Sequence, residues 1–251
     1  MQIDRPYALS IAGFDPSAGA GVLADVKTFE GLRVYGLAIS TAVAIQTDEE
    51  FVECRWENIE EVKKQIELLL KRYSPQYIKI GIVPSLFFLN QILDDVLKNN
   101  SNAKIIWDPV YTSSTGFQFM DKNWKNEDLF KVLKRIYLLT PNRDEAIILS
   151  REKDALKGAK KLSEYCSVLL KGGHNNELSS TDILFSKGGE KYFEQQRLQN
   201  VSKHGSGCVL SSAITACLAK GESLENACAR GKEYIYSFLK SSNSLLGYHV
   251  S

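Results

Sequence analysis

The chain carries short apolar runs separated by segments with helical spacing. Uninterrupted, often β-branched runs predict buried strands, and apolar residues at the period of a helix predict amphipathic helices. The predicted strands are 7–11, 34–45, 51–56, 77–80, 104–107, 136–140, 167–170, 181–185 and 190–195. The predicted helices are 22–32, 59–73, 86–97, 124–134, 143–149, 153–164, the stretch after Cys208, and 224–239.

This order of elements predicts an α/β fold. Strands alternate with helices along most of the chain, which favours a mostly parallel central sheet with helices on both faces. The alternating segment 51–56 is expected to be an exposed or edge strand, and 181–195 is expected to form a hairpin around Lys187-Gly188-Gly189. No repeat, low-complexity segment or linker divides the sequence, so we expect a single domain over residues 1–251.

Polar and glycine residues follow the predicted strands. In sheets of this kind ligands bind at the carboxyl ends of the strands, so these residues should share one rim. They are Gly13-Phe14-Asp15, Gln46-Thr47, Gly81, Asp108-Pro109, Thr140-Pro141-Asn142 and Lys171-Gly172-Gly173. We expect the chemistry of the protein at this rim.

Composition narrows the class of partner. The chain has 251 residues with 31 basic and 30 acidic side chains, and this balance, without a basic run, argues against a nucleic-acid partner. The uncharged stretches are too short and too polar to span a membrane, and the N-terminus lacks the layout of a signal peptide. Five scattered cysteines without zinc-like spacing indicate reduced thiols in a cytoplasmic protein.

The most informative stretch is His204-Gly205-Ser206-Gly207-Cys208, which leads directly into a helix. The first amides of a helix lack internal partners and lie at the positive end of its dipole, so a Gly-Ser-Gly-Cys turn there makes an anion site. The same position is expected to lower the pKa of Cys208. The alternative is an ordinary glycine-rich loop that contains a buried cysteine.

Two carboxylates at the rim could serve a metal ion. Asp108 could bind magnesium or a substrate group, or it could simply form a turn with Pro109. Asn142 is a good helix N-cap, and Glu145 completes a near capping box. Glu145 could instead organise a hydrated Mg²⁺, because magnesium keeps several waters and needs few protein ligands.

Lys171 could neutralise a phosphate group, with Gly172 and Gly173 letting a nucleotide lie against the backbone. The alternative for this tripeptide is a plain β-turn.

A rival class rests on residues 19–24, Gly-Ala-Gly-Val-Leu-Ala, which match the dinucleotide fingerprint of an NAD-type oxidoreductase. Two observations oppose it. Gly19 lies well beyond Gly13, where the strand ends, and Gln46 stands where an acidic residue should end the second strand. The Walker pattern of P-loop enzymes is absent.

Taken together, these pieces resemble the hydroxymethylpyrimidine/phosphomethylpyrimidine kinases, thiamine-pathway enzymes with the ribokinase-like fold. The resemblance begins with Ala-Leu-Ser-Ile-Ala-Gly-Phe-Asp-Pro-Ser-Ala-Gly-Ala-Gly at 8–21 and runs to about residue 240. It continues through residues 24–29, 34–36, 41–47, 79–81, 108–110, 140–146, 170–174 and 204–208.

The resemblance implies an activity. These kinases use ATP and Mg²⁺ to phosphorylate 4-amino-5-hydroxymethyl-2-methylpyrimidine and then its monophosphate. It also implies a homodimer. The nearest rival on the same scaffold is a pyridoxal or pyridoxine kinase, since both substrates are flat heteroaromatic hydroxymethyl compounds. A non-catalytic ligand-binding relative is a third alternative, against which Cys208, Lys171 and Glu145 argue.

The resemblance also implies residue roles. Gln46 matches the residue that hydrogen-bonds the aminopyrimidine edge. The other matches are Gly13, Ala20 and Asp25 on the pocket floor, Val83 and Val110 on its wall, Asn142 and Glu145 near Mg²⁺, Lys171 at phosphate, Gly205 to Cys208 as the anion hole, and Cys208 in the place of a catalytic aspartate. Departures are Ser206 where Thr is usual, Val83 where Met is common, no lysine in 111–116, and a C-terminus at Ser251 that is short for the family.

Overall fold

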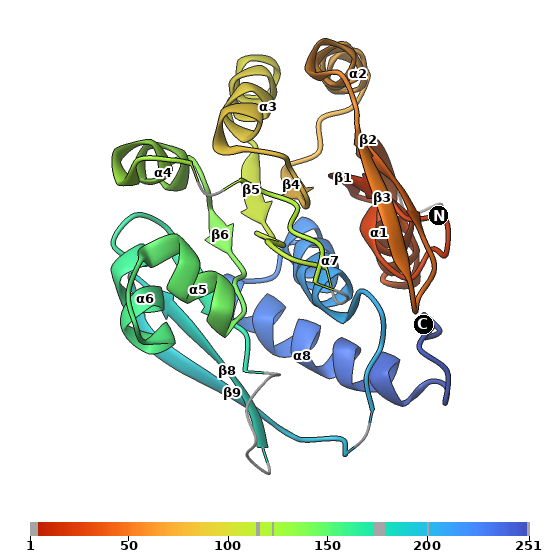
Figure 1. Cartoon of the computed structure of the whole chain (residues 1–251), viewed down its shortest axis with the longest axis vertical. Helices are drawn as coiled ribbons and strands as arrows, with labels where there is room; N and C mark the ends of the chain where they lie inside the picture. The colour runs from red at the N-terminus through yellow and green to blue at the C-terminus, as the bar shows by residue number, and fades with distance from the viewer. Residues whose placement is uncertain (1–4, 114–115, 122, 173–178, 200, 250–251) are drawn as a thin grey trace.

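The computed structural model describes residues 5–113, 116–121, 123–172, 179–199 and 201–249 (Figure 1). Its strands are β1 (Tyr7–Phe14), β2 (Tyr35–Gln46), β3 (Phe51–Trp56), β4 (Tyr77–Ile80), β5 (Lys104–Trp107), β6 (Leu138–Leu139), β7 (Ser167–Leu170), β8 (Ser179–Ser186) and β9 (Gly189–Gln196). Its helices are α1 (Gly21–Gly31), α2 (Ile59–Arg72), α3 (Leu86–Asn99), α4 (Asn126–Leu133), α5 (Arg143–Ser150), α6 (Ala155–Leu162), α7 (Ser206–Ala219) and α8 (Leu224–Lys240).

The strands form one sheet in the order β3-β2-β1-β4-β5-β6-β7-β8-β9. The strands from β2 to β7 in this order pair in parallel, whereas β3, β8 and β9 pair antiparallel to their neighbours. The α/β prediction is therefore confirmed, as are the edge position of β3 and the β8–β9 hairpin.

Side chains of the central strands alternate between two helical layers. On β4, Ile78 and Ile80 belong to the larger apolar cluster, which includes residues of α2, α3, α4, α5 and α6. Tyr77, beside Ile78, belongs instead to the cluster formed with α1, α7 and α8. Figure 1 shows these two sets of helices on opposite faces of the sheet.

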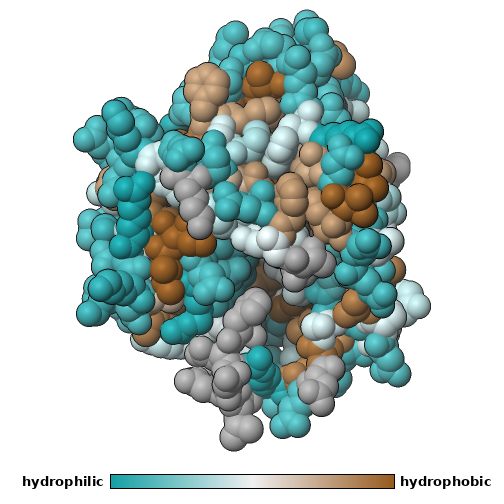
Figure 2. Space-filling view, in the orientation of Figure 1, coloured by the Kyte–Doolittle hydropathy of each residue, from teal (hydrophilic) through white to brown (hydrophobic). Residues whose placement is uncertain are grey.

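Figure 2 shows one side of the molecule, where polar residues predominate and apolar residues are exposed in separate groups.

Some predicted boundaries shift for local reasons. Strand β6 is shorter than predicted. The residues on either side of it, Tyr137 and Thr140, still donate their amides to the carbonyl oxygens of Ile105 and Trp107 on β5. Helix α6 begins later than residue 153, because the Asp154 side chain accepts from the amide of Lys157 at 2.9 Å and so acts as the N-cap.

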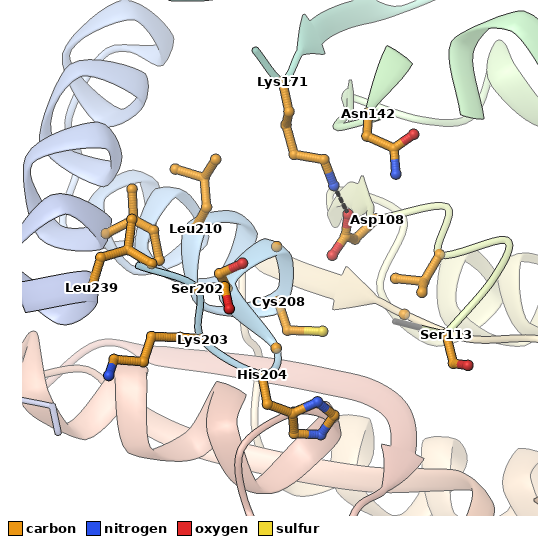
Figure 3. A pocket seen from close by; sticks show the side chains of 18 of the residues that line it. Asp108, Ser113, Asn142, Lys171, Ser202, Lys203, His204, Cys208, Leu210 and Leu239 are labelled. Carbon is orange, nitrogen blue, oxygen red and sulfur yellow. Dashed lines mark hydrogen bonds and ion pairs between the residues drawn. The ribbon is translucent and has the colours of Figure 1, made fainter. Parts of the chain in front are cut away.

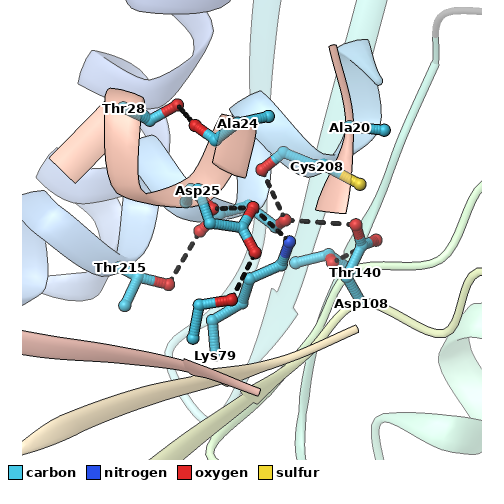
Figure 4. Close-up of polar contacts among 12 residues, drawn as sticks. Ala20, Ala24, Asp25, Thr28, Lys79, Asp108, Thr140, Cys208 and Thr215 are labelled. Atoms are coloured by element: carbon cyan, nitrogen blue, oxygen red, sulfur yellow. Dashed lines mark hydrogen bonds and ion pairs between the residues drawn. The ribbon is translucent and has the colours of Figure 1, made fainter. Parts of the chain in front are cut away.

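A fully buried ion pair joins four elements beneath the rim (Figure 4). Lys79 Nζ on β4 lies 2.6 Å from Asp25 Oδ1 on α1, and neither side chain is exposed to solvent. The Asp25 carboxylate also accepts from Ser10 Oγ on β1 at 2.5 Å and from Ser212 Oγ on α7 at 2.6 Å. The pair therefore fixes α7 against the strands below it.

Breaking this pair should be costly. We predict that Lys79→Met lowers the free energy of unfolding by about 3–5 kcal/mol, because the Asp25 carboxylate then stays buried without a cation. Urea denaturation measures the loss, and adding Asp25→Asn should recover part of it. Lys64→Met, which breaks an exposed pair with Glu61, is the matched control and should leave the midpoint unchanged. Equal effects of the two lysine variants would contradict this prediction.

Candidate active site

A cavity of about 1280 Å³ lies at the carboxyl ends of the parallel strands. Residues from the ends of β1, β2, β5, β7 and β9 line it, together with the first residues of α5 and α7 and one side of α8. The predicted rim is confirmed in part. The rim residues that line this cavity are Gly13, Phe14, Asp15, Gln46, Gly81, Asp108, Asn142 and Lys171, whereas Thr47, Pro109, Thr140, Pro141 and Gly172 do not line it.

The Gly-Ser-Gly-Cys turn forms one wall of this cavity. Gly205 adopts a left-handed conformation with φ 69°, and a Cβ there would lie 2.1 Å from the carbonyl oxygen of Gly19. Only glycine fits this close approach. Ser206, Gly207 and Cys208 line the wall, and no side chain caps the start of α7. The amide of Ser206 donates to the carbonyl oxygen of Lys203, so the amides of Gly207 and Cys208 are the ones that remain available at the cavity. This arrangement has the geometry of an anion site.

Lys171 lies beside the same turn (Figure 3). Its Nζ is 2.8 Å from Asp108 Oδ1 and 3.8 Å from Glu145 Oε2, and a Cβ on Gly207 would lie 3.4 Å from it. Asp108 also accepts from Thr140 Oγ1 at 3.0 Å and Ser211 Oγ at 3.1 Å. Burial alone raises the pKa of Asp108, but Lys171 and Lys79 outweigh it and hold this pKa below its usual range.

Glu145 forms the predicted capping box and also faces Lys171. Its Oε2 accepts from the amide of Asn142 at 2.7 Å, and Asn142 Oδ1 accepts from the amide of Glu145 at 2.8 Å. Burial, together with the charge of Asp108, raises the pKa of Glu145 to about 7, against the opposing effect of Lys171. Two carboxylates thus share one ammonium, a charge balance that suits an added cation.

Within the described residues, no three His, Cys, Asp or Glu side chains cluster as a metal site. The two carboxylates, Asp108 and Glu145, nevertheless fit Mg²⁺, because magnesium keeps several waters and takes few protein ligands. Asp108 and Glu145 are the residues of this cavity that would hold such an ion.

The pKa of Cys208 differs from the sequence prediction. Cys208 lines the cavity and is partly exposed, but burial of its thiol raises the pKa to about 11 despite the nearby Lys79 ammonium. The predicted lowering is therefore wrong for the protein without ligands, because desolvation of a thiolate outweighs the helix start and the lysine. Cys217 on α7 and Cys228 on α8 are buried.

The residues matched to a pyrimidine pocket divide into two groups. Gly13, Ala20, Gln46 and Val110 line the cavity. Asp25 does not, because the buried pair with Lys79 holds it beneath the floor.

Val83 is also absent from the cavity lining. It packs into the apolar cluster with α3, and the preceding residue, Ile82, lines the cavity in its place. A Cβ on Gly13 would lie 2.4 Å from Ile82 Cδ1, so the two residues form one continuous surface. The signal for Ile82 was its place directly after Gly81, at the end of a strand.

The glycines after Lys171 also differ from the prediction. A Cβ on Gly172 would lie 1.9 Å from the carbonyl oxygen of Thr181, and Gly172 is not among the cavity-lining residues. Its small size is required for packing on β8, which is a different reason from close approach of a nucleotide. Gly173 lies outside the described residues.

Sequence reasoning missed the side of the cavity formed by the C-terminal third of the chain. Lys232 on α8 forms an ion pair with Asp182 on β8 at 2.9 Å, and Asp182 accepts from the amide of Gly172 at 2.8 Å. Apolar side chains complete this side: Leu198, Val201, Leu210, Ile235, Leu239 and Leu245. They come from separate segments, 198–201, α7 and 235–245, and share no motif, so the fold is what brings these segments together.

The sheet order, the helix-start anion turn and the lysine beside it define the chain as a ribokinase-like phosphotransferase. The chain belongs to the phosphomethylpyrimidine kinase family, whose model matches residues 15–250. None of the described helices has the length and apolar character needed to cross a membrane.

Individual relatives agree with this placement. A hydroxymethylpyrimidine/phosphomethylpyrimidine kinase of Staphylococcus aureus is 34% identical over 242 residues, covering 93% of this chain and 87% of the relative. The crystal structure of a phosphomethylpyrimidine kinase from Clostridium difficile is 32% identical, with a TM-score of 0.78 over 94% of this chain and all of that one.

A pyridoxal kinase is also similar in structure. The enzyme from Staphylococcus aureus, in complex with AMP-PCP and pyridoxal, has a TM-score of 0.85 at 26% identity, covering 98% of this chain and 93% of that one. The oxidoreductase alternative is overturned by these relatives. In the structure Gly21, with φ 61°, packs directly against the carbonyl oxygen of Gly13, so the fingerprint glycine serves close packing of α1 on β1.

The raised pKa of Cys208 has a direct consequence for alkylation. Since the thiolate is the reactive form, we predict that the rate of iodoacetamide labelling at Cys208 rises about tenfold per pH unit between about pH 7 and pH 10. Mass spectrometry of the Cys208 peptide measures this rate in the protein without ligands. The buried Cys228 is the internal control and should stay unlabelled. A plateau of the Cys208 rate below about pH 8 would show that its pKa is low after all.

Proposed function

We propose that this protein uses ATP and Mg²⁺ to phosphorylate the hydroxymethyl group of 4-amino-5-hydroxymethyl-2-methylpyrimidine and then the resulting monophosphate, in thiamine biosynthesis. The observation that carries the proposal is one cavity in which Gln46, the Gly205–Cys208 turn and Lys171 lie together. The family to which the chain belongs supports the same assignment.

The pyrimidine occupies the half of the cavity formed by β1 and β2. The Gln46 amide both donates and accepts hydrogen bonds, which matches the edge of an aminopyrimidine. Gly13 and Ala20 leave a flat surface without large side chains, and Ile82 and Val110 supply apolar contact for the ring.

The transferring phosphoryl group lies at the start of α7. Phosphoryl transfer depends mainly on in-line positioning and neutralisation of the equatorial oxygens. The amides of Gly207 and Cys208 and the ammonium of Lys171 supply both. When bound, Mg²⁺ neutralises further charge on the phosphates, and Glu145 and Asp108 would hold it in part through water.

The nucleotide occupies the side formed by α7 and α8. The apolar side chains of Leu210, Ile235 and Leu239 offer a surface for an adenine ring. The similar pyridoxal kinase in complex with AMP-PCP supports a nucleotide on this scaffold.

Cys208 is the proposed acceptor of the hydroxymethyl proton. It lines the cavity within the anion turn, beside the point where the substrate hydroxyl must lie. Burial disfavours its thiolate, and the Lys79 ammonium beneath the turn favours it. A loose transition state requires little deprotonation of the nucleophile in advance, so a weakly ionised thiol still suits this role.

A second candidate is a pyridoxal kinase activity. The high structural similarity to the pyridoxal complex favours it, since pyridoxal is also a flat heteroaromatic hydroxymethyl compound. The sequence relatives favour the pyrimidine.

The role of Gln46 can be tested by substitution. We predict that Gln46→Leu weakens binding of the pyrimidine by about 1–3 kcal/mol, because the polar edge of the ring is left without its partner in a closed site. Steady-state phosphorylation with ATP and the pyrimidine should show a raised KM for the pyrimidine and an unchanged KM for ATP.

Cys208→Ala supplies the contrasting variant. It should lower kcat by roughly 10²–10⁴, the usual contribution of a general base, with both KM values close to those of the parent. An unchanged KM for the pyrimidine in Gln46→Leu would contradict the proposed orientation of the substrate.

A further inference from the structure

The segment that follows α8 packs behind the anion turn. Residues 241–249 pass back toward the start of α7, and the amide of His204 donates to the carbonyl oxygen of Leu245 at 2.9 Å. A Cβ on Gly19 would lie 2.8 Å from the Leu246 side chain and 2.6 Å from the His204 ring. The C-terminal segment therefore contacts both the turn and the loop on which the turn rests.

Lys203 makes the strongest of these contacts. Its ammonium donates to the Ser242 carbonyl oxygen at 2.6 Å, to Ser242 Oγ at 2.8 Å and to the Ser244 carbonyl oxygen. These bonds use all of its donors, and no carboxylate of the described residues pairs with it. Figure 3 shows the Lys203 side chain pointing away from Cys208, so its ammonium is turned away from the place of the transferring phosphate.

Burying an ammonium that contacts only neutral oxygens costs free energy of desolvation, which its hydrogen bonds offset in part. Lys203 lies just before the Gly205–Cys208 turn, separated from it by His204. Its carbonyl oxygen accepts from the amide of Ser206 at 3.3 Å. The position of Lys203 therefore fixes the position of the first amides of α7.

The turn is also held from the opposite side. His204 Nε2 lies 2.9 Å from Asp15 Oδ2, and Asp15 in turn accepts from the amides of Ser17 and Ala20. Asp15 thus ties the turn to the first loop, and Lys203 ties it to the C-terminal segment. Removing either contact leaves the turn held from one side only.

The far end of the segment is anchored independently. His249 Nδ1 lies 3.1 Å from Tyr234 Oη and 3.3 Å from Thr28 Oγ1, and Gly247 packs on the ring of Phe238. The amide of Tyr248 donates to Ser241 Oγ at 2.7 Å. The segment is therefore attached to α1 and α8 at points that do not involve the turn.

We infer that Lys203 is a positioning residue, through which the C-terminal segment 241–249 holds the amides of the Gly205–Cys208 turn in place for phosphoryl transfer. The inference rests on the proposed function of the turn as an anion hole. Lys203 lines the cavity, but its ammonium is bound by the C-terminal segment, so the inferred effect on turnover passes through the backbone of residues 204–206.

The test compares Lys203→Met with the parent in two measurements. Steady-state kinetics should show kcat lowered roughly 10- to 100-fold, the cost of a misplaced group of about 1 Å, with KM for ATP unchanged. Hydrogen–deuterium exchange should show faster exchange within 206–209, at the amides of Ser206 and Val209 that donate to the carbonyl oxygens of Lys203 and Gly205, with the amides of β4 and β5 as protected as in the parent. Tyr248→Ala, which removes an exposed side chain of the same segment, is the matched control and should change neither measurement.

If Lys203→Met does not fold, Ser242→Ala is the milder variant, since it removes one acceptor of the ammonium and should give a smaller change of the same kind. Parent-like exchange at 206–209 in the folded variant would overturn the inference, and so would uniformly faster exchange across the sheet. Faster exchange at 206–209 in a protein that phosphorylates no pyrimidine would refute the proposed function and leave the positioning role intact.

Discussion

The arrangement of the active site depends on a charge pair that no water reaches. Lys79 and Asp25 connect the middle of the sheet to α1, and the bonds of Asp25 to Ser10 and Ser212 extend this connection to β1 and α7. Because α7 begins at the Gly205–Cys208 turn, the pair helps to fix the position of that turn relative to the strands. Two buried charges with full hydrogen bonding also specify one arrangement of these elements, since any slip would leave a charge unpaired.

A second group of charges lies at the edge of the cavity. Asp108 and Glu145 share the ammonium of Lys171 at the edge of the cavity, and the turn presents uncapped amides next to it. Gln46, whose side chain is an amide, ends β2 and lines the same cavity. In the proposed function Gln46 recognises the ring, the turn and Lys171 neutralise the phosphate, and Cys208, the proposed proton acceptor, lies in the turn itself.

Local patterns in the sequence predicted much of this. The alternation of apolar runs with helical segments gave the parallel sheet, and the capping box of Asn142 and Glu145 formed as expected because it depends on adjacent residues only. The turn at Gly205 was equally visible, since a left-handed glycine before a helix is a local feature.

Other features depend on burial and on contacts distant in sequence. Asp25 lies outside the cavity because it pairs with Lys79, and Val83 because it packs into the apolar cluster with α3. The raised pKa of Cys208 follows from desolvation, which no sequence motif reports. The partners of Lys232 and Lys203, which are Asp182 and Ser242, are distant from them in sequence, so the fold is needed to bring each pair together.

The central claim is that this cavity acts on a hydroxymethylpyrimidine. The most direct measurement is a competition in which the pyrimidine, pyridoxal and pyridoxine are mixed at equal concentration with ATP and Mg²⁺, and the phosphorylated products are quantified by mass spectrometry. The account predicts that the pyrimidine is consumed first and that its monophosphate is then converted to the diphosphate. Preferential formation of pyridoxal phosphate, with the pyrimidine left unmodified, would contradict it.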